Sequence, residues 1–309
     1  MATPHVLINP HAEGGRARRL QPRVQQWLQH HHIDACVSMP ESIAQAHQVL
    51  RTLPAASRVV LVGGDGTVNQ MLPVLVEQGL ALGLVPQGSG NDLARALGVA
   101  RWGWQRCLDW ALHGTAIPVD VGWLDATHMH RPFLSSLTVG FDSAVGYRAL
   151  HGPRWLRGLP RYLWATLREL SALQTWAMEI SADGVPMHRG TTLFASTLNT
   201  PTYGSGMPAT PDARIDDGQL NLLVAGAFNP VQALAMLPRL LLGRHLGHPR
   251  IQSHTYRQMH IRGDRPLPLA TDGEYIGEAQ EVAVRMAPGQ LRVVCAAGAA
   301  CVGLPARAQ

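Results

Sequence analysis

The stretch VVLVGGDGTVN at residues 59–69 decides the fold of this chain, because an apolar strand runs directly into a glycine-rich turn. A later stretch, LGLVPQGSGNDLARAL at 82–97, repeats the same order of strand, glycine loop and helix. Glycine lets backbone N–H groups come close to a ligand, and the N-terminus of a helix attracts anions. The two loops therefore predict a site for a phosphate-bearing ligand.

Each of these loops also carries an acid, Asp65 in the first and Asp92 in the second. A carboxylate repels phosphate unless a divalent cation lies between the two groups. Neither loop has the GxGxxG pattern of dinucleotide-binding folds or the GxxxxGK[ST] pattern of the P-loop. The sequence thus predicts phosphate binding together with a cation, by a loop of a different kind.

The two loops resemble the nucleotide loops of the diacylglycerol kinase catalytic-domain family, which includes bacterial diacylglycerol and lipid kinases and is related to sphingosine and ceramide kinases. The resemblance extends over nearly the whole chain, and its motifs follow the family's order. It implies an ATP- and Mg²⁺-dependent lipid kinase, most simply one that converts diacylglycerol to phosphatidic acid. The residues leave the lipid open among diacylglycerol, monoacylglycerol, phosphatidylglycerol, sphingosine and ceramide.

The order of apolar segments predicts two domains. Strand-like segments at 5–10, 34–39, 58–62 and 81–85 alternate with amphipathic segments, which favours a parallel sheet with helices on both faces. In the helix that follows 58–62 we expect Pro73 near the first turn. Later segments are short, strand-like and separated by turn residues, as in antiparallel sheets, with helices expected at 160–170 and 229–242.

The expected fold is an α/β N-terminal nucleotide-binding domain, similar to those of NAD kinases and diacylglycerol kinases, followed by an antiparallel, all-β, sandwich-like C-terminal domain. The nucleotide-binding domain is expected at 1–120 and the β-rich lipid-substrate domain at 121–290. The resemblance further implies that 291–309 packs back on the first domain.

The composition favours an anionic partner. The net charge is +5 with a pI near 9.4, and arginine, which binds phosphate through a planar fork, supplies all 26 of the Lys and Arg residues. The chain shows no leader pattern and no run of eighteen apolar residues, so we expect a cytoplasmic protein, peripheral at the inner face of the membrane. We expect no nucleic-acid partner.

The resemblance assigns nucleotide-binding residues to three glycine loops and one isolated serine. The first loop lies in NPHAEGGRA at 9–17, the second in GGDGTVN at 63–69 and the third in GSGND at 88–92. The predicted ATP-binding residues are Asn9, Gly14, Gly15, Ser38, Gly63, Gly64, Asp65, Gly66, Thr67, Val68, Asn69, Gly88, Ser89, Asn91 and Asp92.

A fourth segment, ATDGEYIG at 270–277, carries the acids Asp272 and Glu274. An Asp-Gly pair alone is an ordinary hairpin turn. A hydroxyl that attacks a γ-phosphate, however, benefits from a carboxylate that takes its proton. The resemblance implies that Glu274 is this proton acceptor, with Asp272 beside it as a second catalytic residue.

The segment PDARIDDGQLNL at 211–222 is a candidate metal site. The resemblance implies a structural Mg²⁺ bound by Asp217 and by groups of Arg214 and Gln219, for which we expect the backbone carbonyls. Oxygen ligands of this kind suit Mg²⁺, although a β-turn closed by its own side chain explains the pattern equally well. Asp65, Asp92 and Asp120 are expected as ligands through water.

The segment RWLRGLPRYLWATLR at 154–168 mixes aromatic and aliphatic residues with arginines, as interfacial membrane segments do. It therefore predicts transient contact with anionic lipid, and a core helix with solvated arginines is the alternative.

Two other functions stay open, an NAD kinase and a nucleotide-binding regulator without catalysis. The GSGND loop, the DGE triplet and this segment argue against the first, and the retained acids argue against the second.

Overall fold

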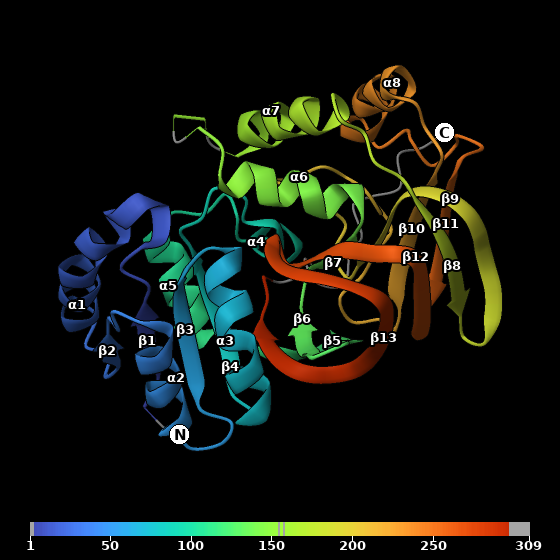
Figure 1. Cartoon of the computed structure of the whole chain (residues 1–309). Coiled ribbons are helices and arrows are strands. Elements are labelled where there is room, and N and C mark those ends of the chain that lie inside the picture. Colours follow the sequence, from blue (N-terminus) through green and yellow to red (C-terminus); the bar gives the residue numbers. More distant parts are fainter. Residues whose placement is uncertain (1–2, 154, 157, 297–309) are drawn as a thin grey trace. The chain divides into compact units, whose positions relative to one another are not determined.

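The structure is a computed structural model that describes residues 3–153, 155–156 and 158–296 (Figure 1). These residues form two compact units, of which the first ends at Val119 and resumes at Gly289, and the second runs from Asp120 to Pro288. Among the described residues, no helix is long and apolar enough to span a bilayer. Arg154, Arg157 and the expected C-terminal segment from 297 lie outside them.

The first unit is built on a parallel sheet. Strand β1 (His5–Ile8) pairs with β2 (Cys36–Ser38) on one side and with β3 (Arg58–Gly63) on the other, and β3 pairs with β4 (Ala81–Pro86). The end of β13 (Glu274–Val294) adds a further parallel strand beside β4. The valines and leucine of β3 are fully buried, which confirms the expected sheet covered on both faces.

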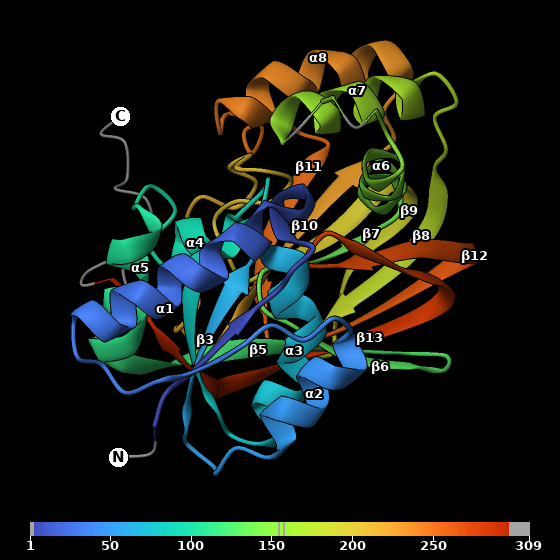
Figure 2. The ribbon, with the colours of Figure 1, turned by 90° about the vertical axis from the view of Figure 1, so that its left-hand side faces the viewer.

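The helices of this unit are η1 (Ala12–Arg19), α1 (Leu20–His30), α2 (Ile43–Arg51), α3 (Asp65–Glu77), α4 (Asp92–Ala96) and α5 (Trp104–His113). In Figure 2, α2 and α3 lie on one side of the strands, and α1 and α5 lie on the other. Right-handed crossovers between parallel strands give this arrangement. The three glycine loops follow β1, β3 and β4, so they share one edge of the sheet.

The expected place of Pro73 was wrong. Helix α3 begins at Asp65, directly after Gly64, so Pro73 lies well inside it and not in its first turn. Proline lacks the N–H that would donate to the carbonyl of Asn69, four residues earlier. The helix starts early because the glycine loop itself supplies its first turn.

The second unit is an antiparallel sheet structure, as expected. Its hairpin is β5 (Ala116–Ala126) with β6 (Met129–Phe133), and its main sheet contains β7 (Ser136–Val139), β8 (Trp176–Ala182), β9 (Val185–Leu198), β10 (Leu220–Gly226), β11 (Ile251–Tyr256), β12 (Gln258–Thr271) and β13. The long strands β9 and β12 each pair with β7 near one end and with β8 near the other. The sheet therefore splits into two layers around an apolar core.

Three helices cover one face of this sheet: α6 (Phe141–Leu150), α7 (Leu159–Leu170) and α8 (Pro230–Leu241). Both views show α7 and α8 side by side, and α6 lies between α7 and the strands (Figures 1 and 2). Helices α7 and α8 match the expected segments. Helix α6 was not expected, because its sequence is short, contains Gly146 and lacks a clear apolar stripe.

Candidate active site

The first glycine loop owes its shape to residues in the left-handed region. Glu13, Gly14 and Gly15 have φ values of 52°, 68° and 89° in succession. A Cβ atom on either glycine would meet nothing within 4 Å, so backbone conformation and not crowding favours glycine here. The side chain of Asn9 ties this loop to the next one, since its Nδ2 donates to Thr67 Oγ1 at 2.8 Å.

The second and third glycine loops lie against each other. A Cβ atom on Gly64 would lie 2.8 Å from the Cα atom of Gly88, and a Cβ on Gly88 would lie 2.7 Å from the Cα of Gly64. Gly64 has a φ of −99°, so it is the close backbone approach that requires glycine. Asn91, with a φ of 55°, closes the third loop by hydrogen bonds to the N–H and the carbonyl of Gly88.

The two acids of these loops have different surroundings. The carboxylate of Asp65 accepts hydrogen bonds from the N–H groups of Asp92 and Leu93, both at 3.1 Å, and so caps helix α4. Asp92 is buried, and Arg95 donates to its Oδ1 at 3.4 Å. Asp65 thus joins two loops that both carry predicted nucleotide-binding residues.

A cavity of about 460 Å³ lies beside the first two loops. It is lined by Leu7, Asn9, His11, Pro40, Glu41, Ser42, Ile43, Ala46, Thr67, Gln70 and Met71. Ser38 is not among these residues, and its Oγ lies 2.7 Å from His5 Nε2. Ser42, which caps helix α2, does line the cavity. Sequence reasoning missed Ser42, although a serine before an amphipathic segment is a recognisable helix start.

The turn from Asp272 to Glu274 joins β12 to β13 in the second unit. Asp272 has a φ of 48°, and Gly273 follows with 85°. The buried carboxylate of Asp272 accepts hydrogen bonds from the N–H groups of Leu134, Ser135 and Ser136, at distances of 2.7–3.2 Å. These bonds fix the loop between β6 and β7 to the turn.

Glu274 differs from its neighbour in charge environment. Its side chain is half-buried, and burial raises the pKa of this carboxyl above its ordinary value. The positive charge of Arg131 lowers this pKa, and the negative charge of Asp272 raises it. A carboxylate with a raised pKa is a stronger base when it is ionised. Of the two acids in this turn, Glu274 therefore has the better chemistry for accepting a proton.

Of the predicted metal residues, Asp120, Arg214, Asp217 and Gln219 lie in the second unit, whereas Asp65 and Asp92 lie in the first. Asp120 is buried, its Oδ2 accepts from Gly218 N at 2.6 Å, and its N–H donates to Ile215 O at 2.7 Å. Burial and the charge of Asp120 raise the pKa of Asp217, whose Oδ1 accepts from Gln219 N at 3.0 Å. A carboxylate whose pKa is raised by burial and by a neighbouring carboxylate provides a donor set that fits a hard cation.

No three His, Cys, Asp or Glu side chains gather as a metal-binding cluster in the described part of the chain. The predicted site has another composition, because backbone carbonyls at 214 and 219 would complete it. The side chain of Arg214 is paired with Asp216 at 3.3 Å. Any contribution of Arg214 to a cation site would therefore come from its carbonyl.

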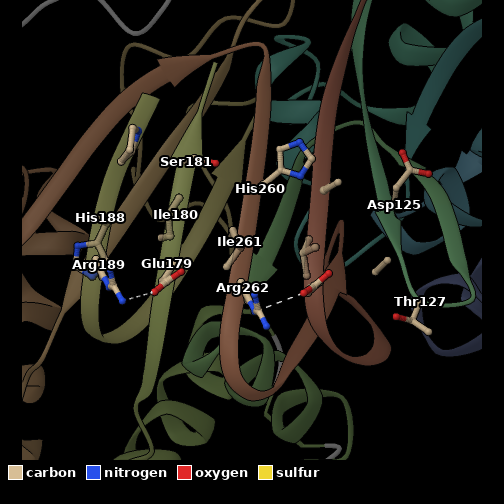
Figure 3. Close-up of a pocket in the computed structure, with 15 residues that line it drawn as sticks. Asp125, Thr127, Glu179, Ile180, Ser181, His188, Arg189, His260, Ile261 and Arg262 are labelled. Atoms are coloured by element: carbon tan, nitrogen blue, oxygen red, sulfur yellow. Dashed lines mark ion pairs between the residues drawn. The ribbon is translucent and has the colours of Figure 1, made fainter. Parts of the chain in front are cut away.

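A wide groove of about 660 Å³ crosses the exposed strands of the second unit (Figure 3). None of the predicted site residues lines it. Its arginines are paired with glutamates of neighbouring strands, Arg189 with Glu179 at 3.0 Å and Arg262 with Glu281 at 3.5 Å. This neutralised surface is a poor site for a nucleotide phosphate, in spite of its size.

Two family models match the chain over most of its length. Residues 3–124 match the diacylglycerol kinase catalytic domain, and residues 135–295 match the YegS C-terminal NAD kinase beta sandwich-like domain. The chain belongs to the diacylglycerol kinase catalytic-domain family. This membership confirms the resemblance of the glycine loops, and it makes the chain a kinase.

Individual proteins with similar sequences or structures support this family assignment. A diacylglycerol kinase of Mycobacterium tuberculosis is 27% identical over 288 residues, which are 89% of this chain and 93% of that protein. The solved structure of a candidate diacylglycerol kinase from Bacillus anthracis has a TM-score of 0.77 at 18% identity and covers 96% of this chain and 98% of its own.

An NAD kinase from Archaeoglobus fulgidus, solved in complex with ATP, has a lower TM-score of 0.52 at 11% identity, with 94% and 93% covered. At these identities the two solved structures establish the fold alone. They confirm the expected combination of an α/β domain with a β sandwich-like domain.

Proposed function

We propose that this family member is an ATP- and Mg²⁺-dependent lipid kinase that transfers the γ-phosphate of ATP to a lipid hydroxyl, most simply from diacylglycerol to phosphatidic acid. The observation that carries the proposal is Glu274, a half-buried carboxyl of raised pKa on a turn held in place by Asp272. The relatives named diacylglycerol kinase support the lipid substrate.

The nucleotide is proposed to bind along the glycine loops of the first unit. Gly64 precedes helix α3 and has no side-chain oxygen with which to cap it, so the first-turn N–H groups are suited to donate to phosphate. The hydrogen bonds of Asp65 and Asn91 fix the conformation of the second and third loops in which both can contact the phosphates. The cavity at Asn9, Ser42 and Thr67 has room for the rest of the nucleotide.

In the proposed reaction, Glu274 accepts the proton of the lipid hydroxyl as its oxygen forms a bond to the γ-phosphorus. The bond between this phosphorus and the oxygen that bridges to the β-phosphate breaks, and ADP leaves. Asp272 acts as a positioning residue, because its oxygens are engaged with the N–H groups of 134–136. Bound Mg²⁺ would neutralise phosphate charge.

The assay that tests this function offers labelled ATP to a panel of lipids in mixed micelles, with NAD as the soluble alternative. We expect label in a neutral glycerolipid and none in NAD. Phosphorylation of NAD alone would favour the NAD kinase alternative. A protein that binds ATP but labels no acceptor would favour the regulator without catalysis.

Removal of Mg²⁺ is expected to lower the melting temperature. An ion that binds only the native state stabilises it by mass action, by about 2.7 kcal/mol at a concentration a hundred times the dissociation constant. Asp217→Ala should abolish the difference between Mg²⁺ and EDTA, whereas Asp212→Ala, on the same segment and exposed, should keep it. If the wild type has the same melting temperature in Mg²⁺ and in EDTA, the structural metal site does not exist.

The segment at 154–168 is proposed to contact anionic membrane. Trp155 is 80% exposed and Leu167 is 53% exposed, and each arginine near an anionic surface contributes about 1 kcal/mol of binding free energy. We expect binding to vesicles with phosphatidylglycerol, weak binding to neutral vesicles, and weaker binding in high salt. Flotation of the protein with vesicles measures all three.

Replacing Arg154, Arg157 and Arg161 by glutamine should raise the apparent KM for vesicle-borne lipid and spare activity on a short-chain soluble analogue. A matched control replaces Arg189, Arg262 and Arg265 by glutamine. It removes the same charge from exposed strands of the second unit. Equal loss of both activities in the first variant would mean that the segment belongs to the core or the active site.

A further inference from the structure

Arg131 lies on the apolar face of the hairpin formed by β5 and β6. It pairs directly with Leu124, and directly paired side chains lie on the same face of a sheet. Leu124 is fully buried in the core of the second unit, and so is Phe133, which shares this face because it lies two residues further along β6. The fold therefore places a cation where the alternation of the strand predicts an apolar residue.

Two contacts bring Arg131 next to the turn that carries the proposed base. In the first, the carboxylate of Asp272 accepts hydrogen bonds from the N–H of Leu134, at 3.1 and 3.2 Å. In the second, a Cβ atom on Gly277 would lie 3.9 Å from Met129 Sδ. Arg131 lies between these contacts on one segment, and the proposed base lies between them on the other. The two side chains therefore belong to one stretch of neighbouring chain.

The charge of Arg131 acts on Glu274. Burial raises the pKa of this carboxyl, the charge of Arg131 lowers it, and the charge of Asp272 raises it. The charged groups that shift the pKa of Glu274 thus come from β6 and from the end of β12. In spite of this effect, Arg131 forms no ion pair with Glu274, so its N–H groups remain available to a ligand.

Within the part of the chain that the structure describes, the guanidinium of Arg131 makes no hydrogen bond and no ion pair. Arg189, Arg262 and Arg285 of the same unit are more exposed, and each is paired with an acid. A partly buried cation without an anion costs free energy, which a bound anion recovers. The surroundings of Arg131 therefore favour an anionic ligand.

The place of Arg131 identifies this anion. In the proposed reaction, Glu274 takes the proton of the hydroxyl whose oxygen bonds to the γ-phosphorus, so the transferred phosphoryl group lies next to Glu274. A guanidinium presents its N–H groups as a planar fork that matches two phosphate oxygens. The charge of the transferred group is spread over its three outer oxygens, so a cation at this place stabilises the transition state.

We propose that Arg131 is a further catalytic residue, which donates hydrogen bonds to the oxygens of the phosphoryl group as this group passes from ATP to the lipid hydroxyl, and then binds the phosphate of the product. The hydroxyl oxygen bonds to phosphorus, the bridging oxygen leaves with ADP, and Glu274 keeps the proton. The inference rests on the proposed lipid kinase function and adds the residue that recognises the phosphate.

The first measurement is the kinetics of Arg131→Met with ATP and a soluble diacylglycerol analogue. We expect kcat to fall about a hundredfold or more. The melting temperature should not fall, because methionine suits an apolar face better than an unpaired charge does. If Arg131→Met does not fold, Arg131→Lys replaces it; lysine keeps the charge but not the planar fork, and should lower kcat about tenfold.

Arg285→Met is the matched control. Arg285 lies over the ring of Trp123, and Trp123 precedes Leu124 on β5, so this arginine is on the opposite face of the hairpin. The control should retain kcat within a factor of about two. An equal loss of kcat in both variants would overturn the assignment of Arg131.

The pH dependence of kcat separates contact with phosphate from an effect on Glu274 alone. Removal of the positive charge raises the pKa of Glu274, so the acid limb of the profile should move to higher pH. If Arg131 contacts the phosphoryl group, kcat stays low even where Glu274 of the variant is ionised. Full recovery of kcat at high pH would mean that Arg131 only keeps Glu274 ionised, and would overturn the proposal.

The second measurement requires no turnover. Calorimetric titration without ATP compares a short-chain phosphatidic acid with the diacylglycerol that has the same chains. Arg131→Met should weaken binding of the phosphatidic acid about tenfold and leave that of the diacylglycerol unchanged. Arg285→Met should leave both affinities unchanged. Equal affinities of the wild type and Arg131→Met for the phosphatidic acid would reject Arg131 as a phosphate ligand.

The two measurements also distinguish this proposal from the proposed function. Weaker binding of phosphatidic acid by Arg131→Met, in a protein that phosphorylates no lipid, would keep Arg131 as a phosphate site and reject the kinase proposal. Phosphorylation of a lipid at the same rate by the wild type and by Arg131→Met would keep the kinase and reject Arg131.

Discussion

Replacing Glu274 by glutamine is expected to lower kcat about a hundredfold or more and to change the affinity for ATP little. The amide keeps the shape of the side chain but cannot accept the proton of the attacking hydroxyl. The raised pKa of Glu274 makes its carboxylate a better base, so its loss has a large effect. Steady-state kinetics with a soluble diacylglycerol analogue, together with titration of ATP binding, separate the two quantities.

Glu278→Gln is the matched control, because Glu278 is exposed and lies four residues further along β13. We expect it to retain kcat within about a factor of two, as surface substitutions usually do. An unchanged kcat in Glu274→Gln would reject Glu274 as the base and leave Asp272 as the next candidate. The bonds of Asp272 to the backbone of 134–136 predict that its own substitution also destabilises the fold.

Replacing Gly64 by valine is expected to lower the affinity for ATP at least a hundredfold, or by about 2.8 kcal/mol. A Cβ atom at this position would lie 2.8 Å from the Cα of Gly88, so the second and third glycine loops must move apart. The N–H groups at the start of α3 and the loop at 88–92 would then no longer match the same phosphates. Calorimetric titration with ATP measures the loss.

Gly103→Val controls for the substitution itself. A Cβ atom at Gly103 meets only a side-chain oxygen of Gln105, at 3.7 Å, and this glycine also precedes a helix. The control should bind ATP like the wild type, and both variants should keep the circular dichroism of the native protein. Tight ATP binding by a folded Gly64→Val would mean that the GGDGT loop is not the phosphate site.

Local sequence patterns were enough to predict much of the architecture. The apolar runs at β1, β3 and β4 followed by glycine loops predicted a parallel sheet, because such runs are buried on both faces only when helices cover them. The short, strand-like segments after about residue 120, separated by turn residues, predicted the antiparallel sheet. Helix α6 escaped prediction, since its sequence is short, contains Gly146 and lacks a clear apolar stripe.

Local patterns could also point to the acids of the candidate site, but not to their roles. The sequence predicted Asp65 as a metal ligand through water and Asp272 as a second catalytic residue. In the structure, the carboxylate of Asp65 accepts hydrogen bonds from the N–H groups that begin α4. The carboxylate of Asp272 accepts them from the backbone of 134–136. Those partners are far away in the sequence, so no spacing pattern indicated them.

What the sequence by itself determined is therefore the order of the elements, the two kinds of sheet and the segments that carry glycine and acid. The tertiary structure alone decided which polar groups are paired with backbone and which stay open to a ligand. It also placed Arg131 next to the turn that carries Glu274. The physical reason is that periodicity reports the side of an element that is buried, whereas the partner of a buried polar atom depends on the path of the whole chain.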